Sequence, residues 1–565
     1  MRWFSLFFCL FIVHFFCAQD IKVSFKKNNF PPKLIFPDSI TLKKNKLKNK
    51  LANLSQKMVA DGYLLFSYDS IIKKDSIVNC YVSCGDRFNN VHLQINKAQK
   101  KRLLNETSIR NKELEKLLFR PADINRLLIQ IRDSYLNSGY PFVDVKLEKI
   151  TLDRKNNLKA NLFVEKGNSY TWSTLHIKGD SSISIKFLTE LLGLKKGQLY
   201  NESRLKKISK ELDQLLFIKE IKPHDLLFTP EGVEIFLYLK SKKASSANGM
   251  VGLQPNTASN TYRLAGELKL KLSNVLKRGE KMELHWKGLR PQTQSLFVSA
   301  SVPFLFNTSF GVGGETILYK QDSSFLELKS SANVQYFIGR GFYIKGLYNF
   351  YNNRSFLSKP SDSKEYLNIR SNSYGMSLFK QKLDYLPNPS KGFLFSTELS
   401  FGNRKTLLYE DSLLKEKKSL TTRSKFCFEF YYPIFNRHIF HGLFSGEQLY
   451  ANDLFNNELV RFGGLNSLRG FNEEELFASA NVSVLFEYRF LVDKNSNAFV
   501  FYNQAWYENS TTSSYYNDYP FGFGLGYSFG SKLGVFSVIY ALGSQLNNPI
   551  ELRNGKLHVG YVSYF

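Results

Sequence analysis

The sequence of 565 residues predicts a transmembrane β-barrel of about sixteen antiparallel strands, preceded by soluble α+β modules. Three observations lead to this fold class. The chain begins with a pattern typical of export, its second half alternates apolar and charged residues, and its amphipathic helical patterns lie before residue 245. Each of these observations constrains a different part of the chain.

The first residues have the features of a secretory signal peptide. A positive charge precedes an almost unbroken apolar run over residues 3–16, and Ala18 is the small residue of a cleavage site. The run is too short to span a bilayer core comfortably, so we expect residues 1–18 to be removed. Cys17 offers lipid modification as an alternative, but Phe16 precedes it where a small residue is usual.

The composition excludes a helical membrane protein and a disulfide scaffold. Mean hydropathy is -0.27, and beyond residue 18 no apolar run is long enough for a transmembrane helix. A membrane span must therefore consist of strands. Cleavage would leave Cys80, Cys84 and Cys427, an odd number, and we expect the first two to be buried thiols.

The chain is strongly basic, with 77 Lys and Arg against 49 Asp and Glu, a formal net charge of +28. Export argues against nucleic acid as the partner, and the basic residues form no aromatic-interleaved patch. Outer-membrane lipid with anionic headgroups is the more natural partner. Solubility and the lining of a lumen explain the same charge equally well.

Strict alternation indicates strands from about residue 245 onward. In Glu267–Leu272, Lys425–Phe430 and Val484–Phe490, one face is apolar or aromatic and the other is charged. A soluble sandwich also alternates, with its apolar face packed inward. Export, segments near ten residues long and a last strand that ends at Phe565 favour a membrane barrel over residues 245–565.

The region before the barrel has the pattern of repeated α+β units. Amphipathic spacing predicts helices over Lys112–Phe119, Asp123–Leu136 and Ser203–Leu216, with strand-like segments after each. Helix, Gly-Tyr and strands follow one another at Gly62-Tyr63 and again at Gly139-Tyr140. This indicates a loose repeat of about 75 residues, the size of a small domain.

These units and strands resemble the outer-membrane assembly superfamily of bacterial surface-antigen barrels, whose members include BamA, TamA and the two-partner secretion transporters. Leu136–Tyr140 followed by Phe163–Gly167 is similar to its polypeptide-transport-associated (POTRA) domains. The resemblance implies a signal peptide and four domains: 1–18 signal peptide, 19–96 first POTRA-like module, 97–168 second, 169–244 third, and 245–565 outer-membrane barrel.

The segment Arg461–Phe471 resembles the signature loop of that family. The resemblance implies a loop folded into the lumen, with Arg469 held by acidic or polar groups. A guanidinium removed from water needs bidentate acceptors, and Glu487 faces inward by the alternation of its strand. Asn503 stands where the family often carries Asp, so Glu487 is the better partner. The predicted loop residues are Gly463, Gly464, Leu468, Arg469, Gly470 and Phe471.

The family also implies a seam between the first and last barrel strands. Gly249 and Gly252 in the first strand and Gly560 in the last should weaken pairing there, and Phe565 ends the last strand. A poorly paired seam could open sideways and lend its edges to other polypeptides.

The resemblance implies assembly or insertion of outer-membrane proteins, or polypeptide translocation, by a BamA/TamA-like machine in the outer membrane with its modules in the periplasm. Its partners would be unfolded outer-membrane protein clients and accessory periplasmic proteins or lipoproteins. A dedicated two-partner secretion transporter and a passive channel or receptor remain alternatives. An enzyme is disfavoured, since the sequence has no His-Glu-x-x-His motif, and we expect no cofactor.

Overall fold

The computed structural model describes most of the chain from Asp20 to Tyr564. The predicted signal peptide, residues 1–18, lies outside the described residues. So do 19, 29, 32–33, 35, 44–45, 75–76, 89, 108, 110–117, 120, 153–156, 181–182, 257–260, 291–292, 340, 357–366, 387, 411–412, 466, 532–533, 547 and 565. The chain divides into two compact units, Met1–Trp172 with Gly197–Leu205, and Ser173–Lys196 with Lys206–Phe565.

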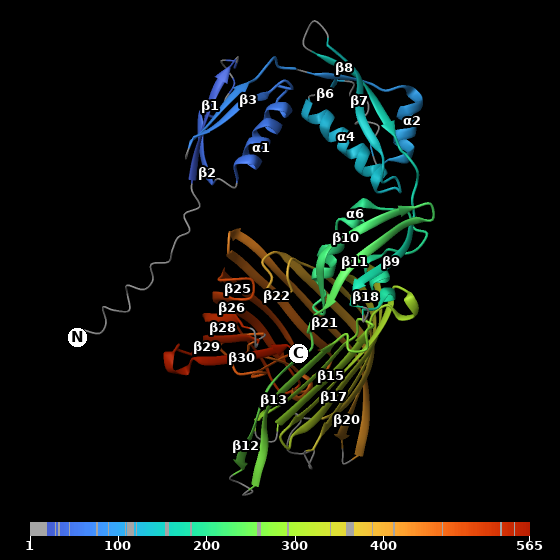
Figure 1. Cartoon of the computed structure of the whole chain (residues 1–565). Helices are drawn as coiled ribbons and strands as arrows, with labels where there is room; N and C mark the ends of the chain where they lie inside the picture. The colour runs from blue at the N-terminus through green and yellow to red at the C-terminus, as the bar shows by residue number, and fades with distance from the viewer. Residues whose placement is uncertain are drawn as a thin grey trace, which may run out of the picture. The chain divides into compact units, whose positions relative to one another are not determined.

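The first module is a four-stranded sheet with one helix packed against it (Figure 1). Cys80 and Cys84 alternate with Val78 and Val82, and all four side chains are buried. Both cysteines are free thiols, as expected, and burial raises the pKa of each. The elements are β1 (Asp20–Asn28), β2 (Ser39–Lys43), α1 (Leu47–Ala60), β3 (Ser67–Lys74) and β4 (Ile77–Ser83), in sheet order β2-β1-β4-β3.

The second module starts earlier than the predicted boundary at residue 97. Its first strand pairs in parallel with a later strand of the same sheet, with Val91 opposite Leu158. The predicted helix over Lys112–Phe119 is also wrong at its end, because the last two residues form a strand; 112–117 lie outside the described residues. The elements are β5 (Val91–Gln94), α2 (Lys97–Glu106), β6 (Leu118–Phe119), α4 (Pro121–Leu136), β7 (Asp144–Leu152) and β8 (Leu158–Glu165).

The Gly-Tyr repeat has a structural basis in the turn after each module's helix. Gly62 and Gly139 both have φ of +102°, a conformation that favours glycine. The carbonyl of Gly62 accepts a hydrogen bond from the amide of Phe88 at 2.9 Å, and that of Gly139 accepts one from Tyr170 at 2.8 Å. In both modules this turn therefore binds the segment that leaves the module.

The third module is a three-stranded sheet with short helices. The predicted helix Ser203–Leu216 is broken at residues 206–207, which periodicity could not show because Leu205, Ile208 and Leu212 keep helical spacing and are all buried. The elements are β9 (Trp172–Gly179), α5 (Ile185–Leu192), α6 (Glu202–Leu205), α7 (Ile208–Asp213), β10 (Ile218–Thr229) and β11 (Gly232–Ser241), in sheet order β10-β11-β9.

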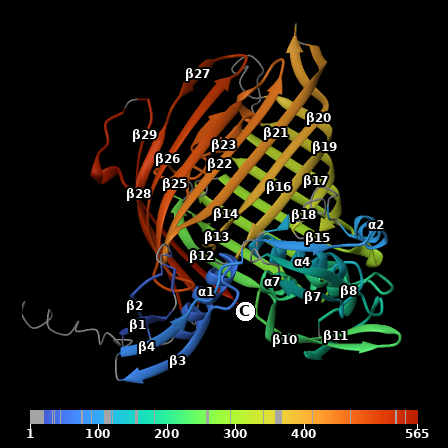
Figure 2. The same cartoon turned by 90° about the horizontal axis from the view of Figure 1, so that it is seen from above.

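All but two of the remaining described strands form a closed antiparallel barrel, coloured green to red around its wall in Figure 1. Two short strands, β27 and β28, both pair with β26 and are successive parts of one strand, so the described residues give sixteen. The two longest strands, β20 and β21, extend beyond their neighbours (Figure 2).

The barrel begins one residue after the predicted boundary at 245. Its strands are β12 (Ser246–Asn256), β13 (Thr261–Ser273), β14 (Lys281–Arg290), β15 (Thr293–Val302), β16 (Phe310–Gln321), β17 (Phe325–Gly339), β18 (Phe342–Ser355), β19 (Asn368–Leu383), β20 (Gly392–Glu410), β21 (Leu413–Phe435), β22 (His438–Ala451), β25 (Ala480–Leu491), β26 (Asn497–Ser510), β27 (Tyr515–Asp518), β28 (Phe521–Gly530), β29 (Val535–Ser544) and β30 (Lys556–Tyr564).

The barrel is inverted relative to a soluble protein. On β25, Phe486 and Tyr488 are exposed on the outer face, whereas Glu487 between them is 1% exposed. A soluble sandwich would bury the aromatic face instead. The aromatic face suits lipid, so the predicted fold class is confirmed. No helix in the described part of the chain is long and apolar enough to cross a membrane.

We predict that the mature protein migrates faster on a denaturing gel when unheated than when boiled. The backbone groups of a closed barrel are paired with one another, which makes the barrel resistant to unfolding by detergent. Electrophoresis of both samples on one gel measures the difference, and identical mobility would contradict the barrel.

Candidate functional site: a lumenal loop and a weak seam

The connection between β22 and β25 forms a structured loop over residues 452–479, which we call the lumenal loop. It contains the short helix η3 (Asn456–Glu458) and a small hairpin of β23 (Val460–Phe462) and β24 (Leu476–Ala478). Phe462, Leu468 and Phe471 of this loop pack in one core with Ala505 and Tyr507 of β26. The loop is thereby fixed against inward-facing residues of the barrel wall.

Glycines shape the tip of the lumenal loop. Gly463 and Gly464 have φ of +113° and +93°, and the amide of Gly464 donates to the carbonyl of Leu468 at 3.0 Å. A Cβ on Gly470 would lie 2.7 Å from the carbonyl oxygen of Leu542 on β29. Glycine is needed here because the backbone of the tip packs directly on the barrel wall.

Arg469 forms hydrogen bonds with the two residues that the sequence predicted as its partners. Its Nη1 donates to Oε2 of Glu487 at 2.6 Å, and its amide donates to Oδ1 of Asn503 at 3.1 Å. Its guanidinium also lies 4.6 Å from the ring centroid of Phe501. Glu487 and Asn503 are both buried. The loop tip is therefore bound to β25 and β26 by charge and by main-chain contacts.

Glu487 is shared with two further residues that the sequence analysis did not identify. Arg489 also donates to Glu487, and Nδ1 of His441 lies 3.3 Å from its Oε1. Nε2 of His441 lies 3.0 Å from Oε1 of Glu429, and its ring stacks on Tyr431 with centroids 4.5 Å apart. Arg489 lies two residues after Glu487 on the same strand and therefore also faces inward. This was the one feature of the sequence that could have indicated the network.

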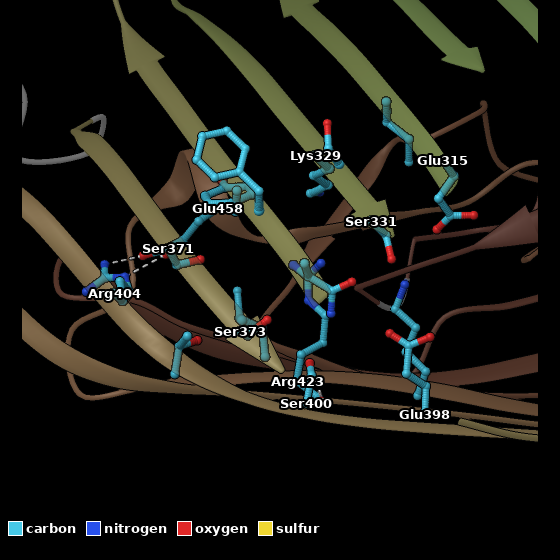
Figure 3. A pocket seen from close by; sticks show the side chains of 18 residues that line it. Glu315, Lys329, Ser331, Ser371, Ser373, Glu398, Ser400, Arg404, Arg423 and Glu458 are labelled. Carbon is cyan, nitrogen blue, oxygen red and sulfur yellow. Dashed lines mark hydrogen bonds and ion pairs between the residues drawn. The ribbon is translucent and has the colours of Figure 1, made fainter. Parts of the chain in front are cut away.

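The lumenal loop is also anchored to β17 and β20 by two further ion pairs. Arg461 pairs with Glu327 of β17 and lies over the ring of Tyr319, with its Cζ 3.8 Å from the ring centroid. Arg404 of β20 forms a bidentate pair with Glu458, with nitrogen–oxygen distances of 2.5 and 2.9 Å. Figure 3 shows this second pair beside a pocket whose lining includes residues of β16 to β21.

These anchors stabilise the loop because each carboxylate is almost inaccessible to water. Glu327, Glu458 and Glu487 are all less than 3% exposed. Loss of one partner of such a pair strands the other charge, at a cost of about 3–5 kcal/mol. The lumenal loop is thus bound on both sides of the barrel interior, and its release would require several buried ion pairs to break.

The seam between β12 and β30 is closed by two residue pairs, Ser246 with Tyr564 and Ala247 with Ser563. Other neighbouring strands have at least seven pairs when β27 and β28 are taken as one strand. The pairing is thus short, as predicted, but not at the predicted residues.

The glycines expected at the seam are paired with the neighbouring strands β13 and β29 and not across the seam. Gly249 and Gly252 pair with β13, opposite Leu268 and Ala265, and Gly560 lies opposite Ser537 of β29. The sequence could not show this, because the register between the first and last strands depends on the stagger of the whole barrel. Phe565 lies outside the described residues.

No family model matches the chain. A stretch of 104 residues is 24% identical to the outer membrane protein assembly factor BamA of Buchnera aphidicola subsp. Acyrthosiphon pisum (strain APS). The match covers 18% of this chain and 17% of that protein.

Two solved structures resemble almost the whole chain. CdiB from Acinetobacter baumannii and CdiB from Escherichia coli have TM-scores of 0.51 and 0.52. Both are 13% identical and cover 92% of this chain, with 98% and 97% of their own chains covered. The chain shares the fold of these two structures.

We predict that Glu487→Ala destabilises the barrel by about 3–5 kcal/mol, more than Arg469→Ala does. The first substitution leaves the guanidinium groups of Arg469 and Arg489 without the carboxylate that pairs with both. The second leaves Glu487 paired with Arg489. The temperature at which gel mobility changes reports barrel unfolding for each variant.

Lys405→Ala is the matched control, because Lys405 and Glu416 form a half-exposed ion pair with a nitrogen–oxygen distance of 2.9 Å. Such pairs contribute about 0–1 kcal/mol. Equal unfolding temperatures for Glu487→Ala and Lys405→Ala would contradict the stabilising role of the lumenal network.

Proposed function

We propose that this chain assembles or inserts other outer-membrane polypeptides in a BamA/TamA-like manner. Clients bind the periplasmic modules and enter the bilayer through the seam between β12 and β30. The two-pair seam is the observation that carries the proposal. We propose no catalytic role and no cofactor.

The seam has strand edges that can form hydrogen bonds with a client entering the membrane. Each backbone group that enters the bilayer unpaired costs several kcal/mol, about 4–8 kcal/mol in a medium without hydrogen-bond partners. Beyond Ala247, β12 pairs with β13 alone up to Asn256, and β30 pairs with β29 alone over Lys556–Val562. These edges could lend hydrogen bonds to an entering strand, whereas the other neighbouring strands of the barrel are extensively paired.

The lumenal loop disfavours the alternative of a dedicated secretion transporter or passive channel. A polypeptide that passes through the lumen must displace a loop bound to Glu487 of β25, Glu327 of β17 and Arg404 of β20. Passage at the seam requires two residue pairs to separate. The lateral route is therefore the less costly one.

The modules supply strand edges for unfolded clients. The strand β7 lies at the edge of the second module's sheet, and its Ile150 and Leu152 are exposed apolar residues. An extended client can pair with such an edge through its main chain, with little dependence on its sequence. This mode of recognition suits a machine with many clients.

We predict that photo-crosslinkers placed at Ile150 and Leu152 capture several different outer-membrane protein precursors in living cells. The same probe at Ile129, an exposed apolar residue on α4 of the same module, should capture far fewer. Mass spectrometry of the adducts identifies the clients. A single secreted partner at both β7 positions would instead support a dedicated secretion transporter.

We predict that a disulfide between Ala247→Cys and Ser563→Cys, which lie opposite each other across the seam, abolishes client assembly until a reductant is added. The background should lack the native Cys80, Cys84 and Cys427. Insertion of a heat-modifiable client barrel is the measurement.

A matched disulfide between β28 and β29 controls for cross-linking itself. Ser528 and Ser537 lie opposite each other with hydroxyl oxygens 2.8 Å apart, so the double cysteine variant should also lock. Assembly should continue with this control locked. Full activity of the locked Ala247–Ser563 barrel would show that lateral opening is wrong.

A further inference from the structure

The connection between the last two barrel strands, residues 545–555, lies on the outside of the barrel wall. Ile539 and Ala541 of β29 are buried among inward-facing residues, so Tyr540 between them faces outward. The Tyr540 hydroxyl donates to the carbonyl oxygen of Leu552 at 2.5 Å. A Cβ on Gly555 would lie 2.3 Å from the same hydroxyl oxygen. We call this segment the β29–β30 connection.

The β29–β30 connection reaches the lipid-facing belt of the barrel. Tyr540 lies opposite Leu525 of β28, an exposed apolar residue on the outer face. The other end of the connection is fixed near the end of β27, where the amide of Leu546 donates to the carboxylate of Asp518 at 2.9 Å. The connection therefore runs along the outer wall from the end of β27 to the level of Leu525.

Three apolar side chains of the connection are substantially exposed in the described part of the chain. Leu546, Ile550 and Leu552 are 59%, 42% and 75% exposed. Clustered exposed apolar residues mark a contact surface, and this cluster continues the apolar belt formed by Leu525 and its neighbours on β28. Continuity with a surface that faces acyl chains indicates lipid as the occupant of the cluster.

The charges of the connection fit a membrane interface with anionic headgroups. Arg553 is adjacent to Leu552, and its side chain is 85% exposed, with Glu551 as a half-exposed partner at 3.1 Å. An Arg beside buried apolar residues can keep its aliphatic stem in the membrane and its guanidinium among phosphates.

We propose that the β29–β30 connection is a lipid anchor beside the seam, which inserts Leu546, Ile550 and Leu552 among the acyl chains and places Arg553 at the phosphates of anionic lipid. Short apolar segments with flanking basic residues bind the interface in this way. The anchor fixes the beginning of β30, whose free edge faces the seam. It does not depend on the proposed assembly function, because its test needs no client.

Spin labels at Leu552→Cys and Leu546→Cys test the anchor in the full chain, in a Cys427→Ser background. Cys80 and Cys84 are 0% exposed and should not react in the folded protein. The protein is reconstituted in vesicles of phosphatidylethanolamine and phosphatidylglycerol, and its heat-modifiable mobility confirms folding. Collision of the label with oxygen, which partitions into lipid, is compared with collision with a water-soluble nickel chelate.

Both labels should collide preferentially with oxygen, as a label at the lipid-facing Leu525→Cys does. A label at Leu65→Cys, which is 62% exposed on the first module, should collide preferentially with nickel. Adding Leu552→Asp should raise nickel collisions of the Leu546→Cys label about twofold or more, because a carboxylate resists insertion. Replacing phosphatidylglycerol by phosphatidylcholine should also raise them if Arg553 binds anionic lipid.

Nickel collisions at Leu552→Cys equal to those at Leu65→Cys would overturn the proposal. Exclusion of both reagents together with spin–spin broadening would overturn it in favour of contact between two copies of the chain. Unchanged collisions in phosphatidylcholine vesicles would remove Arg553 and anionic headgroups from it. Failed client assembly with normal oxygen preference would count against the proposed function alone.

Discussion

The interior of a membrane offers the backbone no hydrogen-bond partner, and the architecture of this chain depends on that constraint. Strands can cross such a medium when each pairs with two neighbours, which requires a closed barrel. Fifteen of the sixteen junctions between the described barrel strands satisfy this with long ladders; the junction of β12 and β30 does so with two residue pairs. The weakest point of the molecule therefore follows from the same constraint that produces its fold.

Closure of the barrel creates a second problem, since its charged faces meet inside. The lumenal loop solves it by bringing Arg461, Arg469 and the carboxylate of Glu458 to complementary groups on the walls. Each buried charge is thereby paired, which avoids the cost of a stranded ion. The loop and the lumen stabilise each other, and neither would be stable in this arrangement alone.

Under the proposed function, a lumen bound to its own loop and a seam with little pairing together would direct clients to the side of the barrel. The modules fit this route, because edge strands such as β7 recognise main chain and hold a client extended. A client would keep its backbone groups paired as it moves from one strand edge to another. Assembly by this proposed path would proceed by exchange of hydrogen bonds.

The sequence by itself determined the barrel, the inward phase of Glu487 and the loop that carries Arg469, because alternation and glycine-rich turns are local properties of the chain. Tertiary structure alone decided that Arg461 meets Glu327, 134 residues away. It also decided that the seam closes at Ser246 and Ala247, because strand register accumulates around the whole barrel.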